Sequence, residues 1–341
     1  MSDIKNSLRS LTAAAGWKLP AARSLSPRQP VILVYHGVPK SGAAVTAEVF
    51  ERQLLFLKQN FDLVSWQQLS AQRQRTSRIQ VVLTFDDGFR NNAEIVAPIL
   101  RRYQAPAVFF VSSRHAEPGK YLWFSYLRLL ETSFCGNGFK FRGEFMEMSP
   151  ARRRTTMTRL RASLLEMKPH PAAMYGAIER ELPRLEDFNS EEDLRNCASG
   201  MTAEQVSELA HDPLFTIGGH TVDHPFLTQC EPHEAALQIA NNKQWLETCG
   251  AECRVFAYPA GDYNELVIEQ CRVAGFSSAF SVTSKIGNAE NFEIPRIGIY
   301  YPSLNELGFK IRWGYLLMRL QSRGIVRSNW SAVTQGRIET E

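Results

Sequence analysis

Two short stretches of the chain carry side chains that are suited to binding a metal ion. Asp86 and Asp87 directly follow the apolar run 81–85, and His220 and His224 stand four positions apart. One carboxylate and two imidazoles can hold a divalent metal ion and leave positions open for water and substrate. The second carboxylate is then free to take a proton from that water. These residue types predict metal-assisted hydrolysis.

The two aspartates can serve one site only if the chain leaves its strand at this point. Neighbouring side chains on a strand point to opposite faces, so Asp86 and Asp87 would diverge within one. Gly88 follows directly and permits a change of direction. Functional groups of parallel α/β folds gather at such carboxyl ends of strands. An exposed Asp-Asp-Gly turn is the alternative interpretation, because these residues are common in turns.

The two histidines suit a shared metal site in a similar way. On a helical turn, His220 and His224 would project from one face, although such a pair alone is a weak sign of a metal site. Gly218 and Gly219 precede them and allow a tight turn just after a strand. The pair is then also expected at the carboxyl end of a strand. Asp223, inside the motif, either orients a histidine or is a solvated turn residue.

The segments around these motifs alternate between strands and helices. Apolar runs typical of buried strands cover 31–35, 81–85, 107–111, 215–217, 255–258, 279–282 and 294–300, with helices between them, among them 232–249 and 265–274. This alternation is typical of a parallel sheet with crossover helices. About seven or eight such strands favour an α/β barrel that is closed or nearly closed.

The same alternation divides the chain into three parts with one interruption. Residues 1–29 are a lead-in, 30–303 form the barrel, and 304–341 form a C-terminal amphipathic helix and tail. Between about 115 and 200 the pattern breaks, which predicts a helical insertion over one face of the barrel. Arginines of this insertion, at 152–154, 159 and 161, either bind an anionic substrate group or form a solvated helix face. The amphipathic segment either lies on a membrane surface or docks on the barrel.

The composition excludes several classes of protein. Hydrophobic residues make up 44% and charged residues 22% of the chain, as in ordinary globular proteins. The net charge of +4 is mild and no nucleic-acid-binding motif accompanies it, so we predict no nucleic-acid partner. Six cysteines without CxxC spacing favour reduced thiols. No apolar stretch has the length of a signal-peptide core or a transmembrane helix, so we expect a cytoplasmic location.

Three motifs resemble those of the polysaccharide deacetylase family, the NodB-homology domain of carbohydrate esterase family 4. Thr84-Phe85-Asp86-Asp87-Gly88 and His220-Thr221-Val222-Asp223-His224 are similar to the first two family motifs residue for residue, and Phe256-Ala257-Tyr258-Pro259-Ala260-Gly261 resembles a variant of the third. The resemblance covers about 30–113 and 213–300. It implies a distorted (β/α)7-type barrel, and the insertion and both termini lie outside it.

The resemblance implies a role for each residue of the first two motifs. Asp87, His220 and His224 match the metal ligands of the family, for which we expect Zn²⁺, with Co²⁺ or Ni²⁺ as alternatives. Asp86 matches the general base. The implied reaction is hydrolysis of an N-acyl group from an amino sugar, or of an O-acyl group from a polymer.

The third motif departs from the family pattern. Tyr258, Pro259 and Ala260 are expected at the substrate, with a backbone N–H near Ala260 binding the oxyanion. Ala260 replaces an aromatic residue that forms one wall of the groove in the family. The family's arginine, which orients the catalytic aspartate, would fall at Ala257, and alanine cannot do this. Arg296 is the predicted replacement.

The general acid must also come from a different place. The family uses a late histidine, and no histidine follows His233 in this chain. His36 comes directly after the run 31–35 and before Gly37, again at the end of a strand. Some members of the family carry a similar Tyr-His on the first strand. We therefore predict that His36 is the general acid, with a structural histidine as the alternative; the four other histidines are expected to be structural.

The chain is therefore expected to be a metal-dependent carbohydrate N-deacetylase in exopolysaccharide or other glycan biosynthesis. The expected partner is an amino-sugar-containing saccharide. The basic amphipathic tail favours a lipid-linked one and peripheral contact with the inner membrane. No protein partner is predicted. Two alternatives stay open: a deformylase of a lipid-linked amino sugar, which uses the same metal chemistry, and an inactive barrel that only binds glycan.

Overall fold

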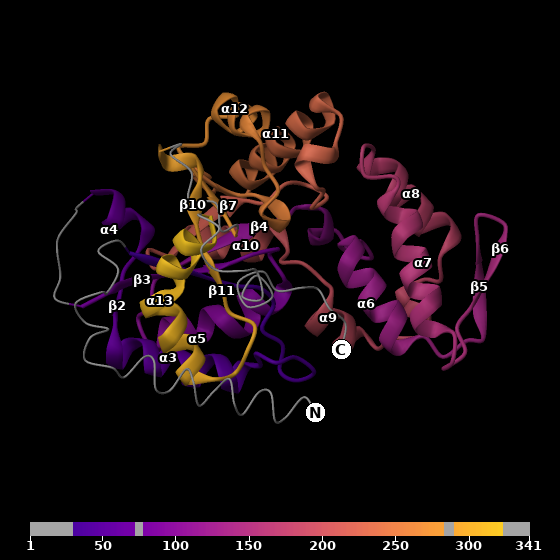
Figure 1. Ribbon diagram of the computed structural model, residues 1–341, viewed down its shortest axis with the longest axis horizontal. Coiled ribbons are helices and arrows are strands. Elements are labelled where there is room, and N and C mark those ends of the chain that lie inside the picture. The colour runs from indigo at the N-terminus through magenta and orange to yellow at the C-terminus, as the bar shows by residue number, and fades with distance from the viewer. Residues whose placement is uncertain (1–29, 72–77, 283–289, 323–341) are drawn as a thin grey trace.

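The computed structural model describes residues 30–71, 78–282 and 290–322. The predicted lead-in and the tail beyond 322 lie outside these residues. Within them, a parallel sheet forms a nearly closed barrel, helices cover its outside, and a second lobe stands beside it (Figure 1). The predicted fold, a distorted (β/α)7-type barrel, is confirmed.

A single parallel sheet forms the wall of the barrel. Its strands are β1 (Val31–Tyr35), β2 (Asp62–Leu63), β3 (Gln80–Phe85), β4 (Ala107–Val111), β7 (Phe215–Gly219), β8 (Val255–Ala257), β9 (Ser278–Ser281), β10 (Ile294–Pro295) and β11 (Ile297–Gly298). Their order is β10-β9-β8-β7-β4-β3-β1-β11, with β2 beside β3, and all pairs are parallel. Because the strands share one direction, their carboxyl ends meet at one rim.

The two edges of the sheet are joined at a single residue, Arg296. β10 pairs with β9 at one edge of the sheet, β11 pairs with β1 at the other, and only Arg296 separates β10 from β11. The prediction of one strand over 294–300 is therefore wrong, because the segment changes its partner at Arg296 and joins both edges. When β10 and β11 are taken as one position, the path through the sheet has seven positions.

Alternate residues of the strands face the interior of the barrel. The interior cluster consists of Ile32, Val82, Val108, Phe110, Val255, Ala257 and Phe280. The residues between them pack against the outer helices in the main core. On β3, Val82 belongs to the interior cluster, so Thr84 and Asp86 follow it on the inner face.

Helices connect the strands on the outside of the barrel. They are α3 (Ala47–Asn60), α4 (Trp66–Ala71), the π-helical η1 (Asn92–Val96), α5 (Ala97–Arg102), α10 (Ala203–Ala210), α11 (Pro232–Thr248) and α12 (Glu265–Val273). Short 3₁₀ turns lie at η2 (Arg114–Ala116), η3 (Leu185–Asp187), η4 (Leu227–Gln229), η5 (Pro259–Gly261) and η6 (Glu290–Phe292). Side-chain caps hold several of the helix starts: Thr46 caps α3, Asn264 caps α12, and Thr202 with Gln205 forms a capping box on α10.

The insertion forms a lobe with its own core. It contains α6 (Trp123–Ser133), β5 (Gly138–Phe141), β6 (Glu144–Glu147), α7 (Arg153–Leu165), α8 (Pro171–Glu181) and α9 (Glu191–Cys197), on the right of Figure 1. Its buried apolar side chains form a cluster separate from the barrel core. The expectation of a helical insertion misses the antiparallel hairpin of β5 and β6, whose Phe139, Phe141 and Met146 pack into this cluster.

Two arginines of the insertion have partners within the lobe. Arg153 donates to the backbone carbonyls of Glu131 and Phe134, and Arg159 pairs with Glu144. These contacts connect α7 to α6 and to the hairpin. Both guanidinium groups therefore stabilise the packing of the lobe. Their contacts do not support the interpretation that the arginines of the insertion bind an anionic substrate group.

The C-terminal helix α13 (Leu304–Ser322) docks on the barrel. Leu307 and Ile311 are buried in the main core, and the ammonium group of Lys310 donates to the carbonyl of Gly298 at 2.8 Å. Of the two interpretations of this segment, docking on the barrel holds for the start of the helix. Among the described residues, we find no helix with the length and apolar character that a membrane span requires.

Candidate metal and catalytic site

Three side chains that can bind a metal ion, those of Asp87, His220 and His224, meet at the carboxyl ends of β3 and β7. The Oδ1 atom of Asp87 lies 3.6 Å from Nε2 of His220 and 3.4 Å from Nε2 of His224. The donor atoms of the three residues all lie within 4.8 Å of one another, and no other histidine, cysteine and acidic side chains in the described ranges gather in this way. The structure thus assembles the three residues that the sequence predicted as ligands.

The Asp87 carboxylate lacks a protein partner at one oxygen. Its Oδ1 atom is buried and accepts no hydrogen bond. Leaving a buried polar atom unsatisfied costs about 1–3 kcal/mol, so such an atom in a folded protein calls for an explanation. A divalent cation between this oxygen and the Nε2 atoms of His220 and His224 would satisfy it. One oxygen and two nitrogen donors suit zinc, cobalt or nickel, so the residues present fit the metal ion that the motifs imply.

The barrel orients the ring of His220. Its Nδ1 atom lies 2.7 Å from the carbonyl oxygen of Ala257, so Nδ1 carries the proton and Nε2 presents its lone pair toward Asp87. Asn242 accepts from the backbone N–H of His220, and the hydroxyl of Ser112 donates to its carbonyl. Ala257 stands where the family motif has an arginine. Its backbone carbonyl, rather than a side chain, orients His220, one of the candidate metal ligands.

Unusual backbone angles bring the ligands to the rim. Asp87, Thr221 and His224 have φ values of 71°, 68° and 52°, in the left-handed region that residues other than glycine seldom occupy. At Asp87 this turn lets two adjacent carboxylates serve one site. The prediction that His220 and His224 lie on a helical turn is wrong, because residues 220–224 form a loop.

The two glycines before this loop have a different role from the predicted one. Gly218 and Gly219 are part of β7 and form no turn. A Cβ atom at Gly218 would lie 2.6 Å from the ring of Phe110 and 2.7 Å from the carbonyl oxygen of Val255. Glycine is therefore required here because neighbouring groups approach the strand closely.

Asp86 forms a buried ion pair with Arg296. The two terminal nitrogens of the guanidinium donate to the two carboxylate oxygens at 2.6 Å each, and Nη1 also donates to the hydroxyl of Thr84 at 3.1 Å. Arg296 is fully buried, and Asp86 is 3% exposed. Burial alone would raise the pKa of Asp86, but the Arg296 charge and hydrogen bonds outweigh it and lower this pKa. The pair thus keeps the carboxylate ionised and fixes its orientation.

His224 and Asp87 have protonation states that suit metal coordination. Burial lowers the pKa of His224 to about 4, because it disfavours the charged ring. Burial opposes charge on Asp87, but the neighbouring histidines outweigh it and lower the pKa of this carboxyl. A neutral imidazole and an ionised carboxylate are the forms that bind a metal ion.

His36 lies at the same rim of the barrel as the two aspartates. It follows β1 and is half-buried, with its ring tilted against that of Tyr300 at a centroid distance of 5.7 Å. Tyr35, the last residue of β1, pairs with Phe85 of β3, so His36 and Asp86 follow neighbouring strand ends. The structure therefore brings His36 and Arg296 to the rim that carries the three ligands, while their catalytic roles stay predictions.

Comparison with known proteins agrees with this geometry. The family model for polysaccharide deacetylase matches residues 73–133 and 177–279. This chain belongs to the polysaccharide deacetylase family. The stretch between the two matched segments, 134–176, falls inside the insertion. As a member of this family, the protein is a carbohydrate deacetylase.

Two solved structures share the fold of this deacetylase. IcaB from Ammonifex degensii is 20% identical with a TM-score of 0.52, and the match covers 84% of this chain and 98% of that chain. The Streptococcus pyogenes deacetylase PplD in complex with acetate is 17% identical with a TM-score of 0.51, and the match covers 82% of this chain and 97% of that chain. No curated protein matches the chain. At these identities the structural likeness shows the fold.

The third motif of this deacetylase contributes less than expected to the site. The ring of Tyr258 is fully buried, stacks on Tyr263 with centroids 4.6 Å apart, and donates its hydroxyl to the carbonyl of Phe292. The Tyr258 side chain therefore serves packing, and a contact between this residue and substrate stays a prediction. Pro259 is also buried, whereas Ala260 is exposed and has a φ of 53°. The backbone around Ala260 remains the candidate for contact with the oxyanion.

His115 supports the site in a way that the sequence did not reveal. This buried histidine has Nε2 at 2.9 Å from the carbonyl oxygen of Asp87 and Nδ1 at 3.3 Å from that of Ala198. It therefore helps to hold the strained backbone of a metal-ligand candidate. No motif or spacing connects His115 with Asp87, so only their contact in the fold identifies it.

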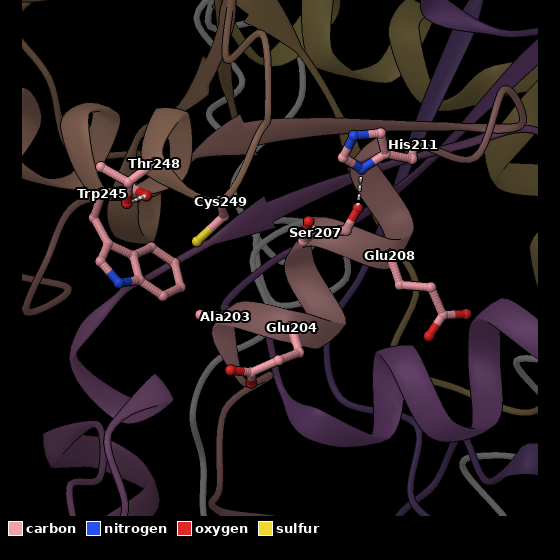
Figure 2. Close-up of a pocket in the computed structure, with 8 residues that line it drawn as sticks. All are labelled: Ala203, Glu204, Ser207, Glu208, His211, Trp245, Thr248 and Cys249. Atoms are coloured by element: carbon pink, nitrogen blue, oxygen red, sulfur yellow. Dashed lines mark hydrogen bonds between the residues drawn. The ribbon is translucent and has the colours of Figure 1, made fainter.

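A hollow of about 530 Å³ lies elsewhere on the deacetylase, between α10 and α11 (Figure 2). Its lining includes Trp245, Cys249 and His211, and none of the predicted site residues. Nδ1 of His211 lies 2.7 Å from the carbonyl oxygen of Ser207, the contact drawn dashed in Figure 2. We assign this hollow no part in catalysis, because it lies apart from the ligand group.

Replacing Arg296 by methionine is expected to destabilise the protein by about 3–5 kcal/mol, because a buried carboxylate loses its partner. Combining Arg296→Met with Asp86→Asn should recover part of this loss, and urea unfolding of the four proteins in the cycle measures it. Arg254→Met is the matched control and should have little effect, since this guanidinium is 69% exposed and pairs with Glu252 at the surface. Strictly additive losses in the cycle would contradict the proposed importance of the pair.

Proposed function

We propose that this protein is a metal-dependent N-deacetylase that acts on an amino-sugar-containing saccharide. The observation that carries this proposal is the buried, unpartnered Oδ1 atom of Asp87 between the Nε2 atoms of His220 and His224. Beside this group stands a second carboxylate, Asp86, which Arg296 keeps ionised. Three ligands and a separate base are the arrangement that amide hydrolysis with an activated water requires.

The residues of the site divide the chemistry among them. Asp87, His220 and His224 would hold the metal ion, for which we propose Zn²⁺, with Co²⁺ or Ni²⁺ as alternatives. When bound, the ion polarises the acyl carbonyl and lowers the pKa of the attacking water. Asp86 accepts the proton of that water at a carboxylate oxygen. Each of these oxygens has a second lone pair besides the one that faces Arg296, so the ion pair leaves room for the proton.

His36 completes the proposed reaction as the proton donor. The amine leaves readily only when its nitrogen is protonated, so a general acid is required. The position of His36 after β1, next to the strand that carries the two aspartates, and against Tyr300 supports this role. We further propose that a backbone N–H near Ala260, at the carboxyl end of β8, donates to the oxyanion.

The finer identity of the substrate is also a proposal. The family makes the substrate an acylated carbohydrate, and we propose an exopolysaccharide or a lipid-linked amino sugar. α13 and the segment after it are rich in apolar and basic residues, which would suit a substrate at a membrane surface. A cytoplasmic location peripheral to the inner membrane is part of the same proposal.

Incubation with N-acetylated amino sugars, followed by mass spectrometry, tests the reaction. We expect loss of an acetyl mass from an N-acetyl saccharide and release of acetate. Removal of metal by a chelator should abolish the release, and added Zn²⁺ should restore it, because the water would otherwise keep its ordinary pKa. Acetate release that persists without metal would refute metal dependence. Formate release from an N-formyl sugar, without acetate release, would favour the deformylase.

The two aspartates should respond differently to the same substitution. Asp87→Asn is expected to lose metal, because the amide is a poorer ligand than the carboxylate. Asp86→Asn should retain metal and lose about 10²–10⁴-fold in kcat, the usual contribution of a general base. Metal content by mass spectrometry and acetate release measure the two effects. Metal loss in Asp86→Asn to the same degree as in Asp87→Asn would contradict the separate roles.

His36→Gln should act on the leaving group rather than on metal binding. For an N-acetyl sugar, kcat is expected to fall by about 10²–10⁴-fold, because the amine nitrogen is no longer protonated. Hydrolysis of 4-nitrophenyl acetate, whose leaving group departs as an anion, should fall much less. His211→Gln is the matched control, since His211 lies away from the site. Equal losses with both substrates would exclude His36 as the general acid.

A further inference from the structure

The ligand loop, residues 220–224, depends on contacts from outside itself. It leaves β7 with left-handed φ angles at Thr221 and His224, and such angles persist only where the surroundings hold them. The barrel holds the first part of the loop: the ring of His220 bonds to the carbonyl of Ala257, and the N–H of Val222 donates to the carbonyl of Gln238.

The insertion holds the second part of the ligand loop. The indole N–H of Trp123 donates to the carbonyl of His224 at 3.3 Å, and the hydroxyl of Tyr175 donates to the carbonyl of Asp223 at 2.8 Å. The Tyr175 hydroxyl also accepts from the backbone N–H of Trp123 at 3.1 Å. Two consecutive carbonyls of the loop are thus bound by side chains from α6 and α8.

Charged groups connect the same elements. The guanidinium of Arg114 lies 3.1 Å from the carboxylate of Asp223, 3.6 Å over the ring of Tyr175, and pairs also with Glu179 of α8. Asp223 is 7% exposed and also accepts from the side chain of Gln238 on α11. The interpretation of Asp223 as a solvated turn residue is therefore wrong, since its carboxylate joins barrel, loop and insertion.

The insertion also packs on the imidazole of His224. The ring of Phe124, next to Trp123 on α6, lies edge-on to that of His224 at a centroid distance of 4.9 Å. The ring of His220 lies at the same distance, 4.9 Å, from that of His224. The two histidines of the motif therefore differ: the barrel orients His220, and the insertion contacts both the carbonyl and the ring of His224.

We propose that the insertion positions His224 for metal binding, through the hydrogen bonds of Trp123 and Tyr175 to the ligand loop. This inference rests on the proposed metal-dependent function, and it assigns the insertion a role in metal binding. Trp123 and Tyr175 are positioning residues, because they bind backbone carbonyls of the loop rather than substrate or metal. Groups that orient metal ligands commonly contribute about 10- to 100-fold to metal affinity.

The test removes these hydrogen bonds and measures metal affinity. Tyr175→Phe deletes the hydroxyl and keeps the ring, and Trp123→Phe deletes the indole N–H. The matched control is Tyr126→Phe, because the Tyr126 hydroxyl donates to the carbonyl of Pro183 at 2.6 Å within the same lobe. Zn²⁺ affinity is measured by competition with a chelator, the ligand geometry by the visible spectrum of the Co²⁺-loaded protein, and metal-free stability by thermal unfolding.

We expect Tyr175→Phe and Trp123→Phe to bind Zn²⁺ about 10-fold more weakly and to shift the Co²⁺ spectrum. Tyr126→Phe should keep the affinity and spectrum of the wild type, even if its metal-free Tm falls as much as that of Tyr175→Phe. Unchanged affinity in both test variants would overturn the positioning role and leave the proposed function intact. Equal weakening in Tyr126→Phe would overturn it too, and a wild type that binds no metal would overturn both proposals.

Discussion

The buried ion pair between Asp86 and Arg296 connects the closure of the barrel with its chemistry. Arg296 is the one residue between β10 and β11, so it sits where the two edges of the sheet are joined. Its charge lies inside an otherwise apolar barrel, next to the ring of Phe110, and a buried charge persists only when it is paired. The bidentate contact with Asp86 supplies that partner. The same contact orients Asp86, the proposed base, so the joining of the two sheet edges and the position of this carboxylate depend on each other.

Near this pair, several residues at the rim have backbone conformations that are unfavourable in isolation. Left-handed angles at Asp87, Thr221 and His224 turn the ligands toward one point, and the orphaned oxygen of Asp87 adds a further cost. The central strands that lead to the rim are regular, with their residues in register and apolar layers on both sides of the sheet. Departures from local preference at a rim of this kind are typical of functional sites, where the surrounding structure sustains them. Here both the barrel and the insertion donate or accept hydrogen bonds that hold the ligand loop.

Sequence reasoning succeeded where the signal was local and periodic. The runs 31–35 and 107–111 are strands with these bounds, because continuous apolar runs suit strands that are buried on both faces. It failed where a contact decided the conformation. The run 294–300 looks like one strand, but its partner changes at Arg296. Gly218 looks like a turn residue, but Phe110 and Val255 crowd it within β7. The insertion's hairpin was missed because its short strands pack into a lobe core that no periodicity reveals.

The sequence by itself determined the strand–helix alternation, the metal-binding side-chain types at 87, 220 and 224, and a second carboxylate at 86, because these depend on residue type and short spacing. It also pointed to Arg296 and His36 by elimination, since the family motif lacks its arginine and its late histidine. Only the tertiary structure decided that Arg296 reaches Asp86 across 210 positions, which nitrogen of His220 faces the site, and that the insertion contacts His224. These facts depend on which distant segments become neighbours, and that follows from the closure of the sheet and the packing of the lobe rather than from any local pattern.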